Sequence, residues 1–390
     1  MTGDSTRSVH EAEPLDPQTG SVTTPIYETS TFGFKKAGDV PIAVGGFGEK
    51  GYTYSRWENP TVVNLERKLA AFEHGAEGAA FSSGMAAIST SVFAFLKKGA
   101  HVLGIRDLYG GTYALLHDIL PEIGFDTDLV DTSDFGALER GVKKNTGIVY
   151  VESPTNPTLK VVDIARAARV ARKNGAVLMV DNTFASPVNQ NPLDLGADIV
   201  LHSVTKYING HADLIAGAAV ASKAATRKIK MMRRDFGGTL DPFPAWLILR
   251  GMKTMAIRVR QQNSSAMALA EFLSTHRKVK AVHYPGLKTH PQHALAKKQM
   301  KGFGGMLSFE IRGTTGDAMR FTESCRVATL AASLGGVETL VSQPYNMTHA
   351  QMSAKERAVT GIPETLVRVS VGVEDVEDLV ADFKQALAAV

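Results

Sequence analysis

The sequence predicts an α/β fold in which a mostly parallel sheet is covered by helices on both faces. Short, continuous apolar segments, typical of strands buried on both faces, occur at 101–105, 147–151 and 177–180. Helical patterns of ten or more residues separate them, as connections between parallel strands require. With 390 residues, 44% hydrophobic and 21% charged, the chain has the composition of a folded protein of about two or three domains.

The first clear element is a helix that starts at Pro60, because Asn59 can cap it and proline suits its first position. The uncharged stretch 78–96 predicts a buried helix, since its serines and a turn signal argue against a membrane span. Asp163 is the expected cap of a helix that runs to Lys173. The other elements expected in this part are a helix at 111–120 and strands at 198–201 and 215–221.

The last third of the chain predicts a smaller second unit. A long, bent helical pattern at 244–275 leads to strands at 306–311 and 366–371, and an amphipathic helix with Asp375 as its expected cap ends the chain. We therefore divide the chain into an N-terminal arm (1–58), an α/β domain (59–245) and a linking helix with a C-terminal domain (246–390). The arm is rich in Gly, Pro, Ser and Thr and needs a surface to lie on, for which a neighbouring subunit is one candidate.

Charge and cysteine content narrow the class of partner. The net charge of 43 − 39 = +4 is spread along the chain, which is too little for a nucleic-acid-binding surface.

The single cysteine, Cys325, cannot form an internal disulfide, so we expect a cytoplasmic protein. No signal peptide or membrane span is expected. His290 and His293 lack a third ligand at a suitable spacing, which favours a surface turn over a metal site. The expected partner is a small molecule.

The motif GFGEKG at 46–51 matches the dinucleotide fingerprint, but its context does not. A true fingerprint opens a helix directly after a strand, whereas here eight residues separate the motif from Pro60. A dehydrogenase is therefore the last of our alternatives.

An acid and a lysine are expected at one edge of the sheet. The strand 177–180 runs into Asp181, and Lys206 follows the strand 198–201. Open α/β sheets bind ligands at the carboxyl ends of their strands. Separately, Asp181 can be a capping residue and Lys206 a surface residue. Together they fit pyridoxal phosphate, whose aldehyde forms a Schiff base with a lysine while an acid keeps its pyridine nitrogen protonated.

The phosphate of such a cofactor needs hydrogen-bond donors. The helix expected after SSGM offers backbone N–H groups, and HSVT offers two hydroxyls. Tyr109, in the loop after 101–105, can stack on the ring, although a core or surface role is its default. The candidate phosphate ligands are Ser83, Gly84, Met85, Ser203 and Thr205.

Eight segments, in order from about Tyr52 to Asp375, together resemble the Cys/Met-metabolism family of pyridoxal-phosphate enzymes. They are YTYSRWENPT, SSGMAAI, DLYGGTY, VESPTNPT, VDNTFASP, HSVTKYINGHAD, SLGGVETL and RVSVGVED. The resemblance implies fold type I, which is aspartate aminotransferase-like, with a smaller α/β C-terminal domain. It also implies a homo-oligomer, usually a tetramer of two active dimers.

The resemblance assigns a role to each matching residue. Lys206 becomes the Schiff-base lysine, Asp181 the partner of the pyridine nitrogen and Tyr109 the stacking residue and acid or base. Tyr54 and Arg56 resemble the pair that reaches the phosphate of the neighbouring subunit. The resemblance gives Asn156 a contact with the phenolic oxygen of the cofactor. Ser333 and Arg368 resemble residues that bind the substrate carboxylate, a task that suits the planar fork of arginine.

Enzymes of this family that catalyse γ-elimination, γ-replacement or β-elimination share these site residues. The reaction must therefore be inferred from differences at a few other positions. Gly111 stands where methionine γ-lyases typically carry Cys. Glu338 resembles the acid that can meet the distal ammonium of cystathionine in cystathionine γ-lyases and γ-synthases. Thr53 occupies the place of a second acid in those enzymes, and the insertion usual in O-acetylhomoserine sulfhydrylases is missing.

These differences favour a cystathionine γ-lyase-like enzyme that releases a thiol, 2-oxobutanoate and ammonia. The alternatives are a homoserine-ester enzyme (cystathionine γ-synthase or O-succinylhomoserine sulfhydrylase) and a methionine γ-lyase. A non-catalytic protein that keeps the fold is disfavoured because both Lys206 and Asp181 are present.

Overall fold

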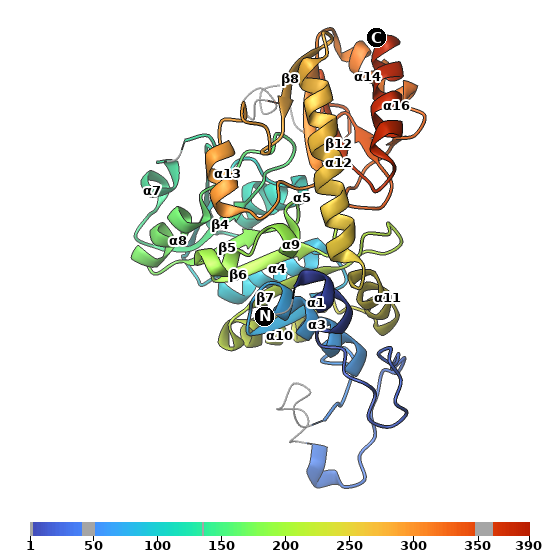
Figure 1. Ribbon diagram of the computed structural model, residues 1–390. Coiled ribbons are helices and arrows are strands. Elements are labelled where there is room, and N and C mark those ends of the chain that lie inside the picture. Colours follow the sequence, from blue (N-terminus) through green and yellow to red (C-terminus); the bar gives the residue numbers. More distant parts are fainter. Residues whose placement is uncertain (1–2, 41–50, 135, 348–361) are drawn as a thin grey trace.

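The computed structural model describes residues 3–40, 51–134, 136–347 and 362–390. Two sheets organise this part of the chain, and the long helix α12 (Met255–Thr275) runs between them (Figure 1). The GFGEKG motif lies outside the described residues except for Gly51.

The helical elements are α1 (Asp4–His10), η1 (Ala37–Asp39), α3 (Pro60–Phe72), α4 (Gly84–Phe95), α5 (Gly110–Ala114), η2 (Leu115–Ile119), α6 (Leu120–Glu122), α7 (Ala137–Gly141), α8 (Ile164–Lys173), α9 (Ser186–Asn189), η3 (Pro192–Leu195), α10 (Lys223–Phe236), α11 (Pro242–Met252), α12, α13 (His293–Gln299), α14 (Thr315–Ser324) and α16 (Val376–Ala388). The strands are β1 (Glu77–Phe81), β2 (His101–Ile105), β3 (Asp126–Val130), β4 (Thr146–Glu152), β5 (Val177–Asp181), β6 (Ile199–Ser203), β7 (Gly217–Ala221), β8 (Val279–His283), β9 (Met306–Ile311), β10 (Thr329–Leu330), β11 (Leu340–Ser342) and β12 (Leu366–Ser370).

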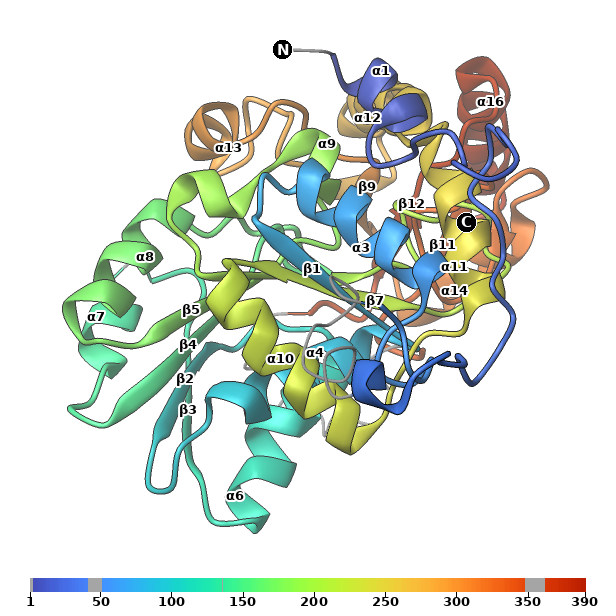
Figure 2. The same cartoon turned by 90° about the horizontal axis from the view of Figure 1, so that it is seen from below.

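The larger sheet has seven strands in the order β1-β7-β6-β5-β4-β2-β3. Its strands are parallel except for β7, which runs antiparallel to β1 and β6. Helices α4 and α10 lie on one face and α3 on the other (Figure 2). Alternate residues of the strands therefore face different helices: Phe81 packs in the core with α4, whereas Ala80 packs in the core with α3. The predicted mostly parallel, doubly covered sheet is confirmed.

The smaller sheet has five strands in the order β10-β11-β12-β9-β8, all antiparallel pairs except β10 with β11. Its core includes the C-terminal half of α12, with Leu269 and Leu273, and Phe383 of α16. Figure 1 shows α12 reaching from α11 beside the larger sheet to α14 and α16. The predicted boundary at 245/246 falls within α11, and the division into domains remains a prediction.

The first residues of the arm pack on their own chain. α1 lies against α12, and Arg260 of that helix donates to Ser5 Oγ (2.9 Å). The buried Glu13 carboxylate pairs with Lys253 (2.8 Å) and with Lys68. Further along the arm, the described residues around η1 extend away from the two sheets (Figure 1).

Several expected elements differ from the structure. Residues 77–81 form strand β1 and only 84–95 form a helix, so a single helix over 78–96 is wrong. A short apolar run is compatible with a helix or a strand, and pairing with β7 makes residues 77–81 a strand. The pattern at 244–275 is two helices, α11 and α12. Asp375 stands at the N-cap of α16 but its side chain makes no capping hydrogen bond.

The helix expected at 111–120 also has a more complex form. It runs from Gly110 to Glu122 and includes a π-helical turn at Leu115–Ile119. The caps proposed at Asn59 and Asp163 are confirmed, since their side chains accept from the N–H groups of Thr61 and Arg166.

Candidate functional site

A cavity of about 480 Å³ lies at the carboxyl ends of the parallel strands, where the smaller sheet meets the larger one. Most of the predicted site residues line it, whereas Tyr54, Arg56 and Glu338 do not. The predicted residues in its wall are Ser83, Gly84, Met85, Tyr109, Asn156, Asp181, Ser203, Thr205, Lys206, Ser333 and Arg368.

The start of α4 forms one end of the cavity. Ser83 is the N-cap, and its hydroxyl accepts from Ala86 N (3.0 Å). The first N–H groups of any helix lack partners within the helix. A Cβ atom added to Gly84 would lie 3.0 Å from Ser203 Cβ, so glycine lets the helix start approach the end of β6. The result is a concave site lined by backbone N–H groups and the hydroxyls of Ser203 and Thr205, which is suited to an anion.

Two carboxyl groups lie side by side in the cavity wall. Asp181 ends β5 and Glu152 ends β4, and the two residues are partners in the strand register. Both are buried, and burial raises the pKa of Asp181. Burial and the nearby Asp181 also raise the pKa of Glu152 well above its ordinary value. A cation placed beside this pair would offset that cost.

Lys206 lies in the turn after β6 and points at the smaller sheet. Its Nζ donates to Ser333 Oγ (2.7 Å). Burial, and secondarily the positive charge of Arg368, lowers the pKa of Lys206 to about 8. A lysine with this pKa supplies a neutral amine near physiological pH, which a nucleophile or a base requires.

Arg368, on β12, is the second cation of the cavity. One terminal nitrogen donates to Asn156 Oδ1 (3.1 Å) and the other to the carbonyl oxygen of Ser333 (3.0 Å). Ser333 has φ = 84°, a left-handed conformation that is costly for a residue with a side chain. The conformation directs the hydroxyl of Ser333 to Lys206 and its carbonyl group to Arg368.

Tyr109 stands at the N-terminus of α5, and half of its surface is exposed (50%). Its backbone N–H donates to Glu152 Oε2 (2.8 Å). A Cβ atom added to the nearby Gly111 would lie 2.8 Å from Tyr109 Cε1 and 2.9 Å from Met85 Sδ. Any side chain at position 111 would therefore displace Tyr109 or Met85.

Tyr54 and Arg56 lie on a separate, exposed segment. The Arg56 guanidinium lies 5.7 Å from the centre of the Tyr54 ring and donates to the carbonyl oxygen of Arg234. Their role at a neighbouring subunit remains a prediction.

A buried charge cluster anchors this segment to α10. Lys230 pairs with Glu58 (3.1 Å), Glu66 (2.9 Å) and Glu77 (2.8 Å), and Arg233 donates to Glu66 (2.6 Å) and to the Trp57 carbonyl oxygen (3.2 Å). Burial raises the pKa of Glu58 to about 7 despite its pairing with Lys230.

Glu338 is exposed in the loop between β10 and β11. A Cβ atom added to Gly336 would lie 3.1 Å from its Oε2. From this loop, only Ala332, Ser333 and Leu334 line the cavity, and none of them is an acid.

The cavity wall also contains residues that were not predicted from the sequence. Glu152 had a usable signal in the sequence, because it is an acid directly after the predicted strand 147–151, just as Asp181 directly follows the strand 177–180. The apolar residues had no such signal, since a single leucine or isoleucine in a cavity wall cannot be told by sequence from one in the hydrophobic core. The missed residues are Ile88, Glu152, Thr183, Phe184, Ile215, Ala332 and Leu334.

The histidine pair differs from expectation in one respect. His290 is buried (6% exposed) rather than on the surface. Its Nδ1 accepts from Gln292 N (3.2 Å), and His293 Nδ1 bonds to the carbonyl oxygen of Pro285 (2.9 Å). Among the described residues, no group of three or more His, Cys, Asp and Glu side chains could hold a metal ion. In the same part of the chain, no helix is both long and apolar enough to span a membrane.

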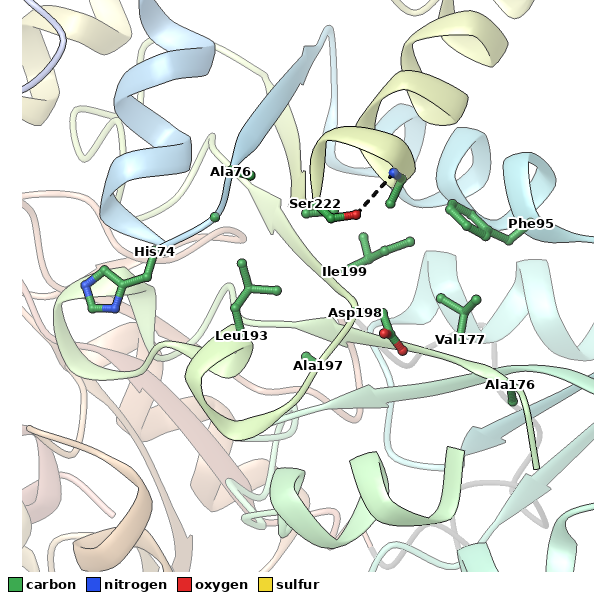
Figure 3. Close-up of a pocket in the computed structure, with 13 residues that line it drawn as sticks. His74, Ala76, Phe95, Ala176, Val177, Leu193, Ala197, Asp198, Ile199 and Ser222 are labelled. Atoms are coloured by element: carbon green, nitrogen blue, oxygen red, sulfur yellow. Dashed lines mark hydrogen bonds between the residues drawn. The ribbon is translucent and has the colours of Figure 1, made fainter. Parts of the chain in front are cut away.

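A second cavity, of about 420 Å³, lies at the opposite edge of the larger sheet, near the amino ends of β5 and β6 (Figure 3). Its polar side chains are His74, Asp198 and Ser222. His74 pairs with Asp194 (2.7 Å), and Ser222 caps α10 through Ala225 N (3.3 Å). None of the predicted site residues lines it.

Comparisons with known proteins agree with the chemistry of the first cavity. The model of the family described as Cys/Met metabolism PLP-dependent enzyme matches residues 5–388. The L-methionine gamma-lyase of Fusobacterium nucleatum subsp. polymorphum is 46% identical over 94% of both chains. The cystathionine beta-lyase of Coxiella burnetii is 43% identical over 98% of this chain and 97% of that one.

A solved structure is similarly close. The cystathionine gamma-lyase of Lactobacillus plantarum, complexed with L-serine, has a TM-score of 0.94 and 40% identity, over 100% of this chain and 99% of that one.

Proposed function

Because the chain belongs to the Cys/Met metabolism family of PLP-dependent enzymes, we propose that it cleaves the Cγ–S bond of a sulfur amino acid, as cystathionine γ-lyases do. The predicted family, fold class, cofactor and enzyme class, a carbon–sulfur lyase, are confirmed. With cystathionine and one water molecule as reactants, the products are cysteine, 2-oxobutanoate and ammonia.

One observation carries the proposal: an amine with a pKa of about 8 and a guanidinium fork share one cavity. Lys206 and Arg368 are joined through Ser333, whose hydroxyl bonds to Lys206 and whose carbonyl bonds to Arg368. In this proposal Arg368 and Ser333 would bind the carboxylate of an amino acid, which would bring its Cα near the lysine.

The residues present fit the cofactor. The helix start at Gly84 and Met85, with the hydroxyls of Ser203 and Thr205, would hold its phosphate. The buried Asp181 would pair with its protonated pyridine nitrogen, Asn156 would contact its phenolic oxygen, and Tyr109 would stack on its ring. When bound, the cofactor supplies an electron sink that acidifies the Cα and Cβ protons of the substrate.

The chain's own residues move the protons. Lys206 Nζ takes the proton from Cα and must give that proton up again, and the neutral amine so restored then removes one from Cβ. The Tyr109 hydroxyl donates a proton to the leaving sulfur, which departs from Cγ as a thiol. The burial of Lys206 limits the access of water to this amine.

Methionine is the second candidate substrate. The exposed position of Glu338 favours it, because the cavity wall provides no acid from the 331–339 loop for the distal ammonium of cystathionine. The 46% identity to an L-methionine gamma-lyase supports the same alternative.

We also propose that the active unit is a homo-oligomer, in which Tyr54 and Arg56 of one subunit complete the phosphate site of another. Their exposure supports this arrangement.

Identification of the products tests the proposed reaction. The purified holoenzyme is incubated with cystathionine, methionine, homocysteine and O-succinylhomoserine, each with and without an added thiol. We expect cysteine and 2-oxobutanoate from cystathionine. Homocysteine and pyruvate would instead indicate β-cleavage, and a new thioether from O-succinylhomoserine would indicate γ-replacement. Either result as the main activity would overturn γ-elimination.

A further inference from the structure

Glu152 is a buried carboxyl group in the active-site wall to which the proposed chemistry gives no task. It is 3% exposed, ends β4, and lies beside Asp181 at the end of β5. A buried carboxylate is costly unless specific partners compensate it. The raised pKa of Glu152, caused by burial and then by Asp181, reflects this cost. A side chain that only filled space here would not need to be acidic.

The two carboxylate oxygens of Glu152 bond to two different loops. Oε2 accepts from the backbone N–H of Tyr109 (2.8 Å), after β2, and Oε1 accepts from the backbone N–H of Asn156 (3.1 Å), after β4. A carboxylate accepts with both terminal atoms, whereas a glutamine side chain accepts with one and presents N–H donors at the other. The contact to both loops thus requires an acid.

The contacts continue from Glu152 to the residues proposed to bind substrate. Asn156 Oδ1 accepts from Arg368 (3.1 Å), and Arg368 donates in turn to the carbonyl oxygen of Ser333 (3.0 Å). Ser333 accepts from Lys206 (2.7 Å). Glu152 therefore lies between the tyrosine that faces one side of the cavity and the chain of contacts that ends at the lysine.

We propose that Glu152 is a positioning residue that fixes the backbone of Tyr109 and of Asn156 and thereby orients the Tyr109 hydroxyl toward the leaving group. This inference rests on the proposed function, in which Tyr109 is the acid. Glu152 itself transfers no proton to or from the substrate.

A double-mutant cycle tests this role. Elimination by the holoenzyme is measured for Glu152→Gln, Tyr109→Phe and the double variant. We expect Glu152→Gln to bind the cofactor and to lower the elimination rate by about tenfold or more, the effect of losing one well-formed hydrogen bond. When the Tyr109 hydroxyl is already absent, the same substitution should cost less than about threefold, since residues in one network are not additive.

A matched control is Glu310→Gln, which alters a buried carboxylate of the smaller sheet that pairs with Lys280 and His283. It should leave the rate and the visible circular dichroism of the bound cofactor unchanged, whereas Glu152→Gln should change that dichroism. If the losses of Glu152→Gln and Tyr109→Phe multiply in full, Glu152 does not act through Tyr109 and the proposal is overturned.

Two further measurements keep the outcome decisive. If Glu152→Gln does not fold, Glu152→Asp, which keeps the charge but withdraws it by one methylene, takes its place in the same cycle. If the enzyme eliminates none of the sulfur amino acids, the proposed function fails. In that case the visible circular dichroism of the bound cofactor is the test. Glu152→Gln should change it and Glu310→Gln should not, and an unchanged dichroism in Glu152→Gln would overturn the role of Glu152.

Discussion

The amine of Lys206 donates a 2.7 Å hydrogen bond to the hydroxyl of Ser333 and thereby joins the two sheets of the protein. Lys206 follows a strand of the larger sheet, and Ser333 precedes a strand of the smaller one. The site therefore exists only where the two sheets meet, and a substrate carboxylate bound by Ser333 and Arg368 would lie directly beside the lysine.

Recombination of the apoenzyme with pyridoxal phosphate should depend on pH through Lys206. Its pKa of about 8, lowered by burial and by Arg368, means that the amine is protonated and unreactive below pH 8. The rate should rise by about tenfold per pH unit up to that point and level off above it. Arg368→Gln should move the midpoint to higher pH. A rate independent of pH between 6 and 9, measured by the visible absorbance of bound cofactor, would contradict the assignment, and Lys206→Ala is the control.

Tyr109→Phe should separate the first proton transfer from elimination. The variant keeps the ring, so it should bind the cofactor and exchange the Cα proton of bound substrate with deuterated solvent. Elimination should fall by about 10²- to 10⁴-fold, the usual contribution of a general acid. Proton NMR follows the exchange and 2-oxobutanoate assays follow the elimination. Unchanged elimination would remove the acid role of this residue.

Arg56→Ala and Lys206→Ala subunits should complement each other. If Arg56 of one subunit completes the site of another, a mixed dimer contains one site free of both lesions. After subunit exchange at equal concentrations, the activity should reach about a quarter of that of the unmodified enzyme, because half of the dimers are mixed and each has one intact site. Absence of recovery, with exchange proven by mass spectrometry, would argue for a site within one chain.

Glu338→Ala should weaken cystathionine more than methionine, since only cystathionine carries a distal ammonium. Because Glu338 is exposed, its ion pair should be worth no more than about fivefold in KM. The KM for methionine should not change. Equal losses with the two substrates would remove the sequence-based reason for ranking cystathionine first.

His290 should make stability depend on pH. Burial lowers its pKa to about 4, so the folded protein keeps it neutral while the unfolded chain binds a proton below about pH 6.5. Its contribution is present above pH 6.5 and is lost as the pH falls toward 4, up to about 3 kcal/mol. His290→Gln should therefore reduce the fall in the thermal midpoint between pH 6.5 and 4. His117→Gln, at an exposed position, is the control. If the thermal midpoints of His290→Gln and His117→Gln depended on pH in the same way, the prediction would be contradicted.

The sequence was informative wherever the chemistry follows a strand along the chain. Asp181 and Lys206 each end or follow a buried strand, and parallel strands place their carboxyl ends at one edge of the sheet. The helix start at Gly84 is equally local, because its cap and its glycine are adjacent. These local features predict a cofactor site without any information on tertiary contacts.

Other features depended on contacts between distant segments. Residues 77–81 became a strand because β7 was available as a partner, a choice that hydrophobic pattern alone does not make. His290 became buried through packing that no local signal describes.

The sequence by itself therefore determined the fold class and the identity of the reactive groups, because both are encoded in short segments. Tertiary structure alone decided how these groups meet. It joined Ser333 to Lys206, linked Arg368 to Asn156, and placed the Glu152 carboxylate between Tyr109 and Asn156. The physical reason is that hydrogen bonds depend on tenths of an ångström between chain segments far apart in sequence, and only the packing of the two sheets sets those distances.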